Sequence, residues 1–139
     1  MPVLLGLDFG QKRIGVAVSD ESGAMAFPLT MILFKSRKFV LAELTKIFDE
    51  HHVEKIVVGL PKTLSGEIGL AAQKVMENTE WFKAATGRAW VFWDERLSTK
   101  EVERILIDAD VRRDKRKEVR DQLAAQRILQ NYIDFHRAS

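Results

Sequence analysis

The sequence predicts an α/β domain built on a five-stranded mixed sheet flanked by helices, with an antiparallel meander followed by two parallel strands. Three apolar runs separated only by short turn clusters fill residues 3–33, and this spacing is typical of a meander. Two further apolar runs, at 56–60 and 90–93, each follow a segment with helical spacing. Such helical crossovers predict parallel strands. A length of 139 residues fits a single domain, 1–139, that can bury a core.

The first three predicted strands are Val3–Leu7, Ile14–Val18 and Ala26–Leu33. The first is almost continuously apolar, as expected of a central strand that is covered on both faces. The turns between the strands, at 9–12 and 19–23, contain glycine, serine and charged residues. Because Pro28 has no backbone N–H, we expect the third strand to lie at an edge of the sheet.

Helices are predicted where apolar residues recur at a spacing of three or four positions. The first follows Ser36, and the second covers residues 70–85 and ends at Gly87. A third begins at Ser98, where Ser98-Thr99-Lys100-Glu101 has the capping-box pattern. A charged connection over residues 112–120 then leads into a final helix from about residue 119 to 136.

The sequence argues against cysteine-based sites, a signal peptide and a membrane-spanning segment. The absence of cysteine excludes disulfides, thiolate zinc sites and cysteine nucleophiles. No basic segment precedes the first apolar run and Asp8 interrupts it, so we expect no signal peptide. The longest nearly apolar stretch, residues 24–34, is too short to span a bilayer. We therefore expect a cytoplasmic protein with no membrane partner, and the net charge of +2 indicates a polyanionic partner only weakly.

Acidic residues stand where two predicted strands end. Asp8 follows the first apolar run, and Asp94-Glu95 follows the fifth. Ligands of open mixed sheets bind beyond the carboxyl ends of the parallel strands. If these two strands lie side by side in parallel, Asp8 and either Asp94 or Glu95 converge at one end of the sheet.

A third acid is predicted to join them from the final helix. Asp121 shares a helix face with Ala124, Ala125 and Ile128, and the two alanines would let the helix approach the sheet closely. Three crowded carboxylates repel one another unless a cation lies between them, and oxygen ligands select Mg²⁺ or Mn²⁺. Such clusters hold two ions about 3.5–4 Å apart and hydrolyse phosphodiesters without histidine, cysteine or a nucleophilic serine.

Each acid also has a structural interpretation. Asp8 could be an ordinary residue before a glycine turn, and Asp94 could cap a turn. Glu95 could form a solvated pair with Arg96, and Asp121 could lie near a helix N-terminus, where negative charge is favoured. The combination of three acids on this topology is what favours a metal site.

Basic residues accompany the predicted site and are candidates for contact with nucleic-acid phosphates. Lys12 and Arg13 lie across the turn from Asp8, but adjacent strand residues face opposite ways, so we expect at most one to point into the site. Arg96 could hold a phosphate or orient the carboxylates. The charged run before Asp121 is either solvated surface or a backbone-binding loop, and its candidate residues are Arg112, Arg113, Lys115, Arg116 and Lys117.

Four segments together resemble one family: GLDFGQKRIGVAVSD, IVVGLP, DERLST and KEVRDQLAAQRILQNYID. In order and spacing they are similar to the YqgF family, also called RuvX, whose members are known as Holliday junction resolvases or pre-16S rRNA nucleases. The resemblance covers nearly the whole chain, residues 3–135. It implies an RNase H-like fold and a divalent-metal site made by Asp8, Glu95 and Asp121, with Glu95 favoured over Asp94.

The resemblance implies a metal-dependent nuclease that matures the 5′ end of pre-16S rRNA. One alternative is a Holliday junction resolvase, which needs a two-fold dimer for paired cuts. Another is a non-catalytic binding protein of ribosome assembly. Actin-like sugar kinases share the Asp-x-Gly hairpin but need two such domains. The expected partners are therefore nucleic acid, either pre-rRNA or a DNA junction, and ribosomal particles, for a protein that is a monomer or weak homodimer.

Overall fold

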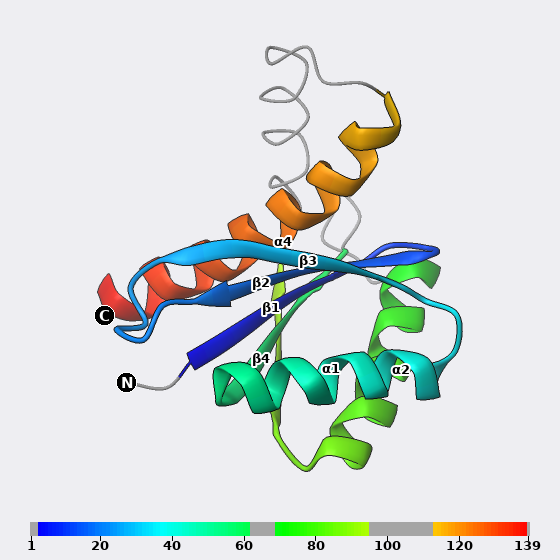
Figure 1. Ribbon diagram of the computed structural model, residues 1–139, viewed down its shortest axis with the longest axis horizontal. Coiled ribbons are helices and arrows are strands. Elements are labelled where there is room, and N and C mark those ends of the chain that lie inside the picture. The colour runs from blue at the N-terminus through cyan, green and yellow to red at the C-terminus, as the bar shows by residue number, and fades with distance from the viewer. Residues whose placement is uncertain (1–2, 62–68, 95–112, 139) are drawn as a thin grey trace.

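The architecture is a five-stranded mixed sheet with helices on both faces (Figure 1). The computed structural model describes residues 3–61, 69–94 and 113–138, with side chains described for 122–136 in the last range. The strands are β1 (Val3–Phe9), β2 (Arg13–Ser19), β3 (Ala26–Leu33), β4 (Val53–Leu60) and β5 (Ala89–Asp94). The helices are α1 (Arg37–His51), α2 (Leu70–Thr86) and α4 (Arg113–Ala138).

The strand order is β3-β2-β1-β4-β5, which places β1 at the centre. β2 pairs antiparallel with both β1 and β3, and β4 and β5 run parallel to β1. The predicted meander and parallel pair are therefore confirmed, as is the edge position of the strand that contains Pro28. Our assumption that the first and fifth strands lie side by side is wrong, because β4 lies between β1 and β5. The three parallel strands nevertheless end at the same edge of the sheet.

Strand alternation divides the core into two layers. On one face, Leu5 and Leu7 of β1 pack with apolar residues of α1 and α2, including the fully buried Phe82. On the other face, Val57 of β4 packs with Leu129 of α4. The central strands are apolar on both faces because helices cover both of them.

Gly6 determines how closely α4 approaches the sheet. A Cβ atom at Gly6 would lie 2.8 Å from Leu129 Cβ and 3.0 Å from the Ala125 carbonyl oxygen, too close for any side chain. Ala124 and Ala125 are both buried at this contact, so the predicted close approach of the helix is confirmed. Gln130, nearer the C-terminus of α4, accepts a hydrogen bond from Ala26 N at 2.8 Å. The helix runs antiparallel to β1, so its C-terminal end lies beside the start of that strand (Figure 1).

α4 begins six residues earlier than the sequence predicted. Residues 113–118 belong to the helix, so the prediction of a charged connection over 112–120 is wrong for this part. Arg, Lys and Glu are good helix formers, and opposite charges three positions apart, such as Asp114 and Lys117, favour a helix. Because this segment has no apolar stripe, its periodicity did not reveal the helix. The helix predicted from Ser98 lies outside the described residues.

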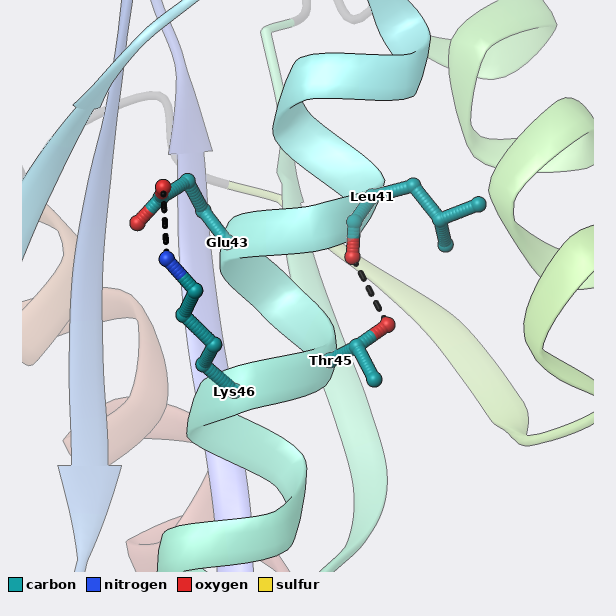
Figure 2. Close-up of polar contacts among 4 residues, drawn as sticks. All are labelled: Leu41, Glu43, Thr45 and Lys46. Carbon is teal, nitrogen blue, oxygen red and sulfur yellow. Dashed lines mark hydrogen bonds and ion pairs between the residues drawn. The ribbon is translucent and has the colours of Figure 1, made fainter.

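The ends of α1 and α2 follow the predicted signals. Ser36 Oγ accepts a hydrogen bond from Phe39 N at 3.0 Å, as an N-cap residue does. Gly87 ends α2 in the left-handed region, with φ of 65°. The outer face of α1 is polar: Lys46 pairs with Glu43 at 3.4 Å, and Thr45 Oγ1 donates to the Leu41 carbonyl at 2.8 Å (Figure 2).

The carboxylate of Asp20 stabilises the turn between β2 and β3. Its Oδ1 accepts from Ala24 N at 2.9 Å, and its Oδ2 accepts from Ser22 Oγ at 2.9 Å. These hydrogen bonds favour the charged form of Asp20 and lower its pKa, and the bond from Ser22 has the largest effect. The perturbed carboxyl thus has a structural explanation at the turn that follows β2.

Candidate active site

Asp8 is half-buried near the end of β1, on the face of the sheet that α4 covers. Its position is set by alternation, since Gly6, two residues earlier, packs against α4. Its partner on β2 is Gly15. On β4 its neighbour is Gly59, which directly follows Val58, the partner of Leu7. Glycines therefore occupy the positions directly beside Asp8 on both adjacent strands.

α4 carries residue 121 to the level of Asp8. The Ala125 carbonyl lies against Gly6, and residue 121 is one helical turn closer to the helix N-terminus, about 6 Å along the axis. Asp8 is two residues beyond Gly6, about 6.6 Å along β1 in the same direction. The backbone thus places residue 121 of α4 at the level of Asp8, and the side chain of Asp121 lies outside those described.

Asp94, the last residue of β5, belongs to the other face. It pairs with Leu60 of β4, whose side chain is 6% exposed in the core under α1 and α2. Trp93, the partner of Gly59, is the β5 residue on the face of Asp8. Alternation therefore separates Asp94 from Asp8. Glu95 lies outside the described residues.

Of the two basic residues beside Asp8, strand alternation favours Arg13. Arg13 begins β2 and shares the face of Gly15 and therefore of Asp8, whereas Lys12 is exposed in the turn. Within the described part of the chain, Arg13 Nη1 is buried without a hydrogen-bond partner. An unpaired buried guanidinium nitrogen costs stability, and an anion would satisfy it.

For the other predicted basic residues, the structure describes at most the position of the backbone. Four of them lie in the first turns of α4, with side chains outside those described: Arg113, Lys115, Arg116 and Lys117. Arg96 and Arg112 lie outside the described residues. The basic stretch therefore belongs to the same helix as Asp121, upstream of it.

Of the three favoured metal ligands, Asp8, Glu95 and Asp121, the structure describes the side chain of Asp8. Carboxylate oxygens are the donors that Mg²⁺ and Mn²⁺ prefer, so Asp8 has the chemistry of a ligand for either cation. Among residues 3–61, 69–94 and 122–136, no three acidic or histidine side chains form a metal-binding group. Glu95 and the side chain of Asp121, two of the three favoured ligands, lie outside those residues, so the metal site stays a prediction.

Sequence reasoning missed the significance of Gly59, because only the register shows that it lies beside Asp8. The turn that follows Asp8 is held by a backbone hydrogen bond, in which the Gly10 N–H donates to the Arg13 carbonyl at 2.7 Å.

None of the helices in the described ranges combines the length and the apolar character needed to cross a bilayer.

Comparison with known proteins identifies the family. The sequence model of RuvX, described as a Holliday junction resolvase, matches residues 2–135. The chain belongs to the RuvX family. This confirms the resemblance inferred from the four sequence segments, and it confirms the class of enzyme, a phosphodiester-hydrolysing nuclease.

Curated relatives in the RuvX family match this chain over nearly their whole length. A protein of Clostridioides difficile (strain 630) named "Putative pre-16S rRNA nuclease" is 50% identical over 132 residues, covering 95% of this chain and 94% of its own. A protein of the same name from Desulforudis audaxviator (strain MP104C) is 43% identical over 135 residues, covering 97% and 96%.

Solved structures confirm the RNase H-like fold. Thermus thermophilus RuvC in complex with a Holliday junction substrate has a TM-score of 0.61 at 12% identity, over 100% of this chain and 98% of its own. The fowlpox virus resolvase in complex with Holliday junction DNA has a TM-score of 0.60 at 10% identity, over 96% and 98%. At such identities the likeness is one of fold.

Proposed function

We propose that this member of the RuvX family is a divalent-metal-dependent nuclease that matures the 5′ end of pre-16S rRNA in the cytoplasm. The observation that supports it most is the juxtaposition at the edge of the sheet: Asp8 lies between two glycines at the level of residue 121 of α4. The names of its relatives support rRNA as the substrate.

The proposed metal ligands are Asp8, Glu95 and Asp121. Asp94 is the weaker alternative to Glu95, because its partner Leu60 belongs to the opposite face. Mg²⁺ or Mn²⁺ held by these carboxylates would supply an activated water and stabilise the leaving oxygen. The role of the chain is to hold the carboxylates rigidly. β1 fixes Asp8 because Leu5 and Leu7, on the opposite face of the strand, are completely buried in the core.

The proposed phosphate ligands are Arg13 and the basic residues at the start of α4. Arg13 is supported by its position on the face of Asp8 and by its buried Nη1, which has no hydrogen-bond partner in the described ranges. A guanidinium binds a phosphate through two parallel hydrogen bonds, so one phosphate would satisfy the unpaired donor. Lys12, Arg96, Arg112, Arg113, Lys115, Arg116 and Lys117 would add charge along the bound strand.

Arg13→Met is expected to stabilise the free protein while weakening its binding to RNA. Removing a buried unpaired donor should raise the free energy of unfolding by about 1 kcal/mol. Binding to a structured rRNA fragment should weaken about tenfold, and the slope of log K against log[salt] should fall by about 1. The exposed Lys12→Met is the control and should change the stability by less than about 0.5 kcal/mol. Equal RNA affinity of Arg13→Met and wild type would remove Arg13 from the site.

The proposed function is tested by comparing substrates under identical conditions. The wild-type protein is incubated with Mg²⁺ or Mn²⁺ and three molecules: a 16S rRNA precursor with its 5′ extension, the mature 5′ end, and a four-way DNA junction. We expect cleavage of the precursor at the mature end, no cleavage of the mature RNA, and complete inhibition by EDTA. A protein that binds the precursor but never cleaves it would instead be an assembly factor.

Resolution of DNA junctions is the second candidate, because the description of the family favours it. Paired cuts require two active sites related by a two-fold axis, and therefore a dimer. Sedimentation with and without a junction tests this requirement. A monomer under both conditions, together with slower cleavage of the junction than of the rRNA precursor, would exclude it.

A further inference from the structure

A pocket of about 440 Å³ opens on the face of the sheet opposite to Asp8. It lies at the edge where β1 and β4 end, since Phe9 directly follows Asp8 and Pro61 directly follows β4. The first turns of α2 form its other side through Ala71, Lys74 and Asn78. Its volume is within the range of sites that bind small organic molecules. None of the predicted site residues whose side chains the structure describes lines it.

The apolar walls of the pocket are two phenyl rings that the core holds in place. Phe9 and Phe34 both line the pocket and both contact Phe82, with ring centroids 6.2 and 6.4 Å from it. Phe82 is fully buried and stacks on Trp90 at 5.8 Å with an interplanar angle of 9°. The walls are therefore aromatic and held in place by the core, which suits a planar ligand.

The polar side of the pocket is an oriented amide. Asn78 is 9% exposed, and its Oδ1 accepts a hydrogen bond from Arg37 Nε at 3.0 Å. The Arg37 guanidinium in turn lies 5.7 Å from the Trp81 ring centroid. With Oδ1 engaged, the Asn78 amide presents its N–H groups as donors to a ligand in the pocket. Lys74 and Gln11 are exposed around it.

We propose that this pocket binds one unpaired nucleobase of the RNA strand that is cleaved. The ring of a base packs against the aromatic walls, its carbonyl or ring nitrogen accepts from Asn78, and the adjoining phosphate contacts Lys74. Because the pocket and Asp8 flank the same end of β1, a strand that crosses this edge reaches both. The proposal rests on the proposed function for its substrate, whereas a free mononucleotide has the same chemistry and is the alternative source of the base.

The pocket is filled by Ala71→Phe, and Gln73→Phe is the matched control. Both residues are exposed on α2, but only Ala71 lines the pocket, so the two variants differ in the pocket and not in the kind of substitution. Lys74→Gln is a second variant that removes only the charge. The probes are an rRNA hairpin with a short single-stranded extension and the same hairpin with one abasic nucleotide at each extension position in turn. Affinities are measured in EDTA, so that the RNA is not cleaved during the binding measurement.

For wild type and Gln73→Phe, one abasic position should weaken binding by about 5- to 150-fold, the effect of losing one base–aromatic stack. Ala71→Phe should bind the intact hairpin more weakly than wild type by the same factor, and an abasic nucleotide should not weaken its binding further. Lys74→Gln should weaken binding several-fold and remain sensitive to it. Equal affinity of Ala71→Phe and Gln73→Phe for the intact hairpin would overturn the proposal.

NMR titration with adenosine or cytidine monophosphate separates the two sources of the base. Shifts of the Asn78 side-chain amide with no abasic effect would assign the pocket to a free mononucleotide and overturn the strand-binding proposal. The abasic effect together with failure to cleave rRNA would support the pocket and contradict the nuclease function. Cleavage of rRNA without an abasic effect would support the nuclease function and contradict the proposed base-binding pocket. The experiment can therefore refute either proposal without refuting the other.

Discussion

Replacing Asp8 with asparagine is expected to slow metal-dependent cleavage of the rRNA precursor by at least about a thousandfold. Asparagine keeps the shape of the side chain between Gly15 and Gly59 but removes the negative charge that binds the cation. Since the fold is unaffected, the loss should appear in kcat rather than in RNA affinity measured without metal. Single-turnover rates of wild type and variant over a range of Mn²⁺ concentrations measure it.

Asp94→Asn is the matched control for this experiment. Asp94 also ends a parallel strand but pairs with Leu60 on the opposite face, so we expect a loss of less than about tenfold. Thermal unfolding provides a readout without RNA: Mn²⁺ should raise the Tm of wild type and Asp94→Asn more than that of Asp8→Asn. An Asp94→Asn variant as inactive as Asp8→Asn would reassign the second ligand. Wild-type rates for Asp8→Asn would refute the metal site.

Replacing Gly6 with alanine is expected to impair both stability and cleavage. The added Cβ would lie 2.8 Å from Leu129 Cβ and 3.0 Å from the Ala125 carbonyl oxygen. These atoms belong to the backbone of α4 or are attached directly to it, so they cannot move aside as the end of a flexible side chain can. Such overpacking typically costs about 1–3 kcal/mol of unfolding free energy. Relief of the clash requires α4 to move away from β1, which also moves residue 121 away from Asp8. We therefore expect at least about a tenfold loss of kcat in the fraction that remains folded.

Gly87→Ala distinguishes this local effect from a general loss of stability. Gly87 has a φ of 65° with nothing near its missing side chain, so alanine there costs about 1 kcal/mol through backbone strain alone. It lies at the end of α2 and should leave the cleavage rate of the folded protein unchanged. Denaturant unfolding and cleavage rates of both variants test the difference. A Gly6→Ala variant with wild-type activity would show that α4 does not position the site.

Most of the fold could be predicted from local patterns. The apolar runs, the turn clusters, Ser36 and Gly87 are signals within a few residues, and they predicted β1 to β5, α1 and α2 closely. The start of α4 was missed because helix propensity, not an apolar stripe, extends it to Arg113. Local patterns identify elements well because burial imposes a period on each strand and helix.

The sequence by itself determined the family, the class of enzyme and the acids that are proposed to bind metal. Tertiary structure alone decided that Asp94 and Asp8 lie on opposite faces of the sheet. The order β1-β4-β5 puts a strand between Asp8 and Asp94, and the register puts Asp94 with Leu60 on the opposite face. Likewise only the assembled sheet brings Gly59 beside Asp8 and buries Arg13 Nη1 without a hydrogen-bond partner among the described residues. The reason is physical: side-chain alternation is local, whereas strand order and register come from packing between residues far apart in the chain.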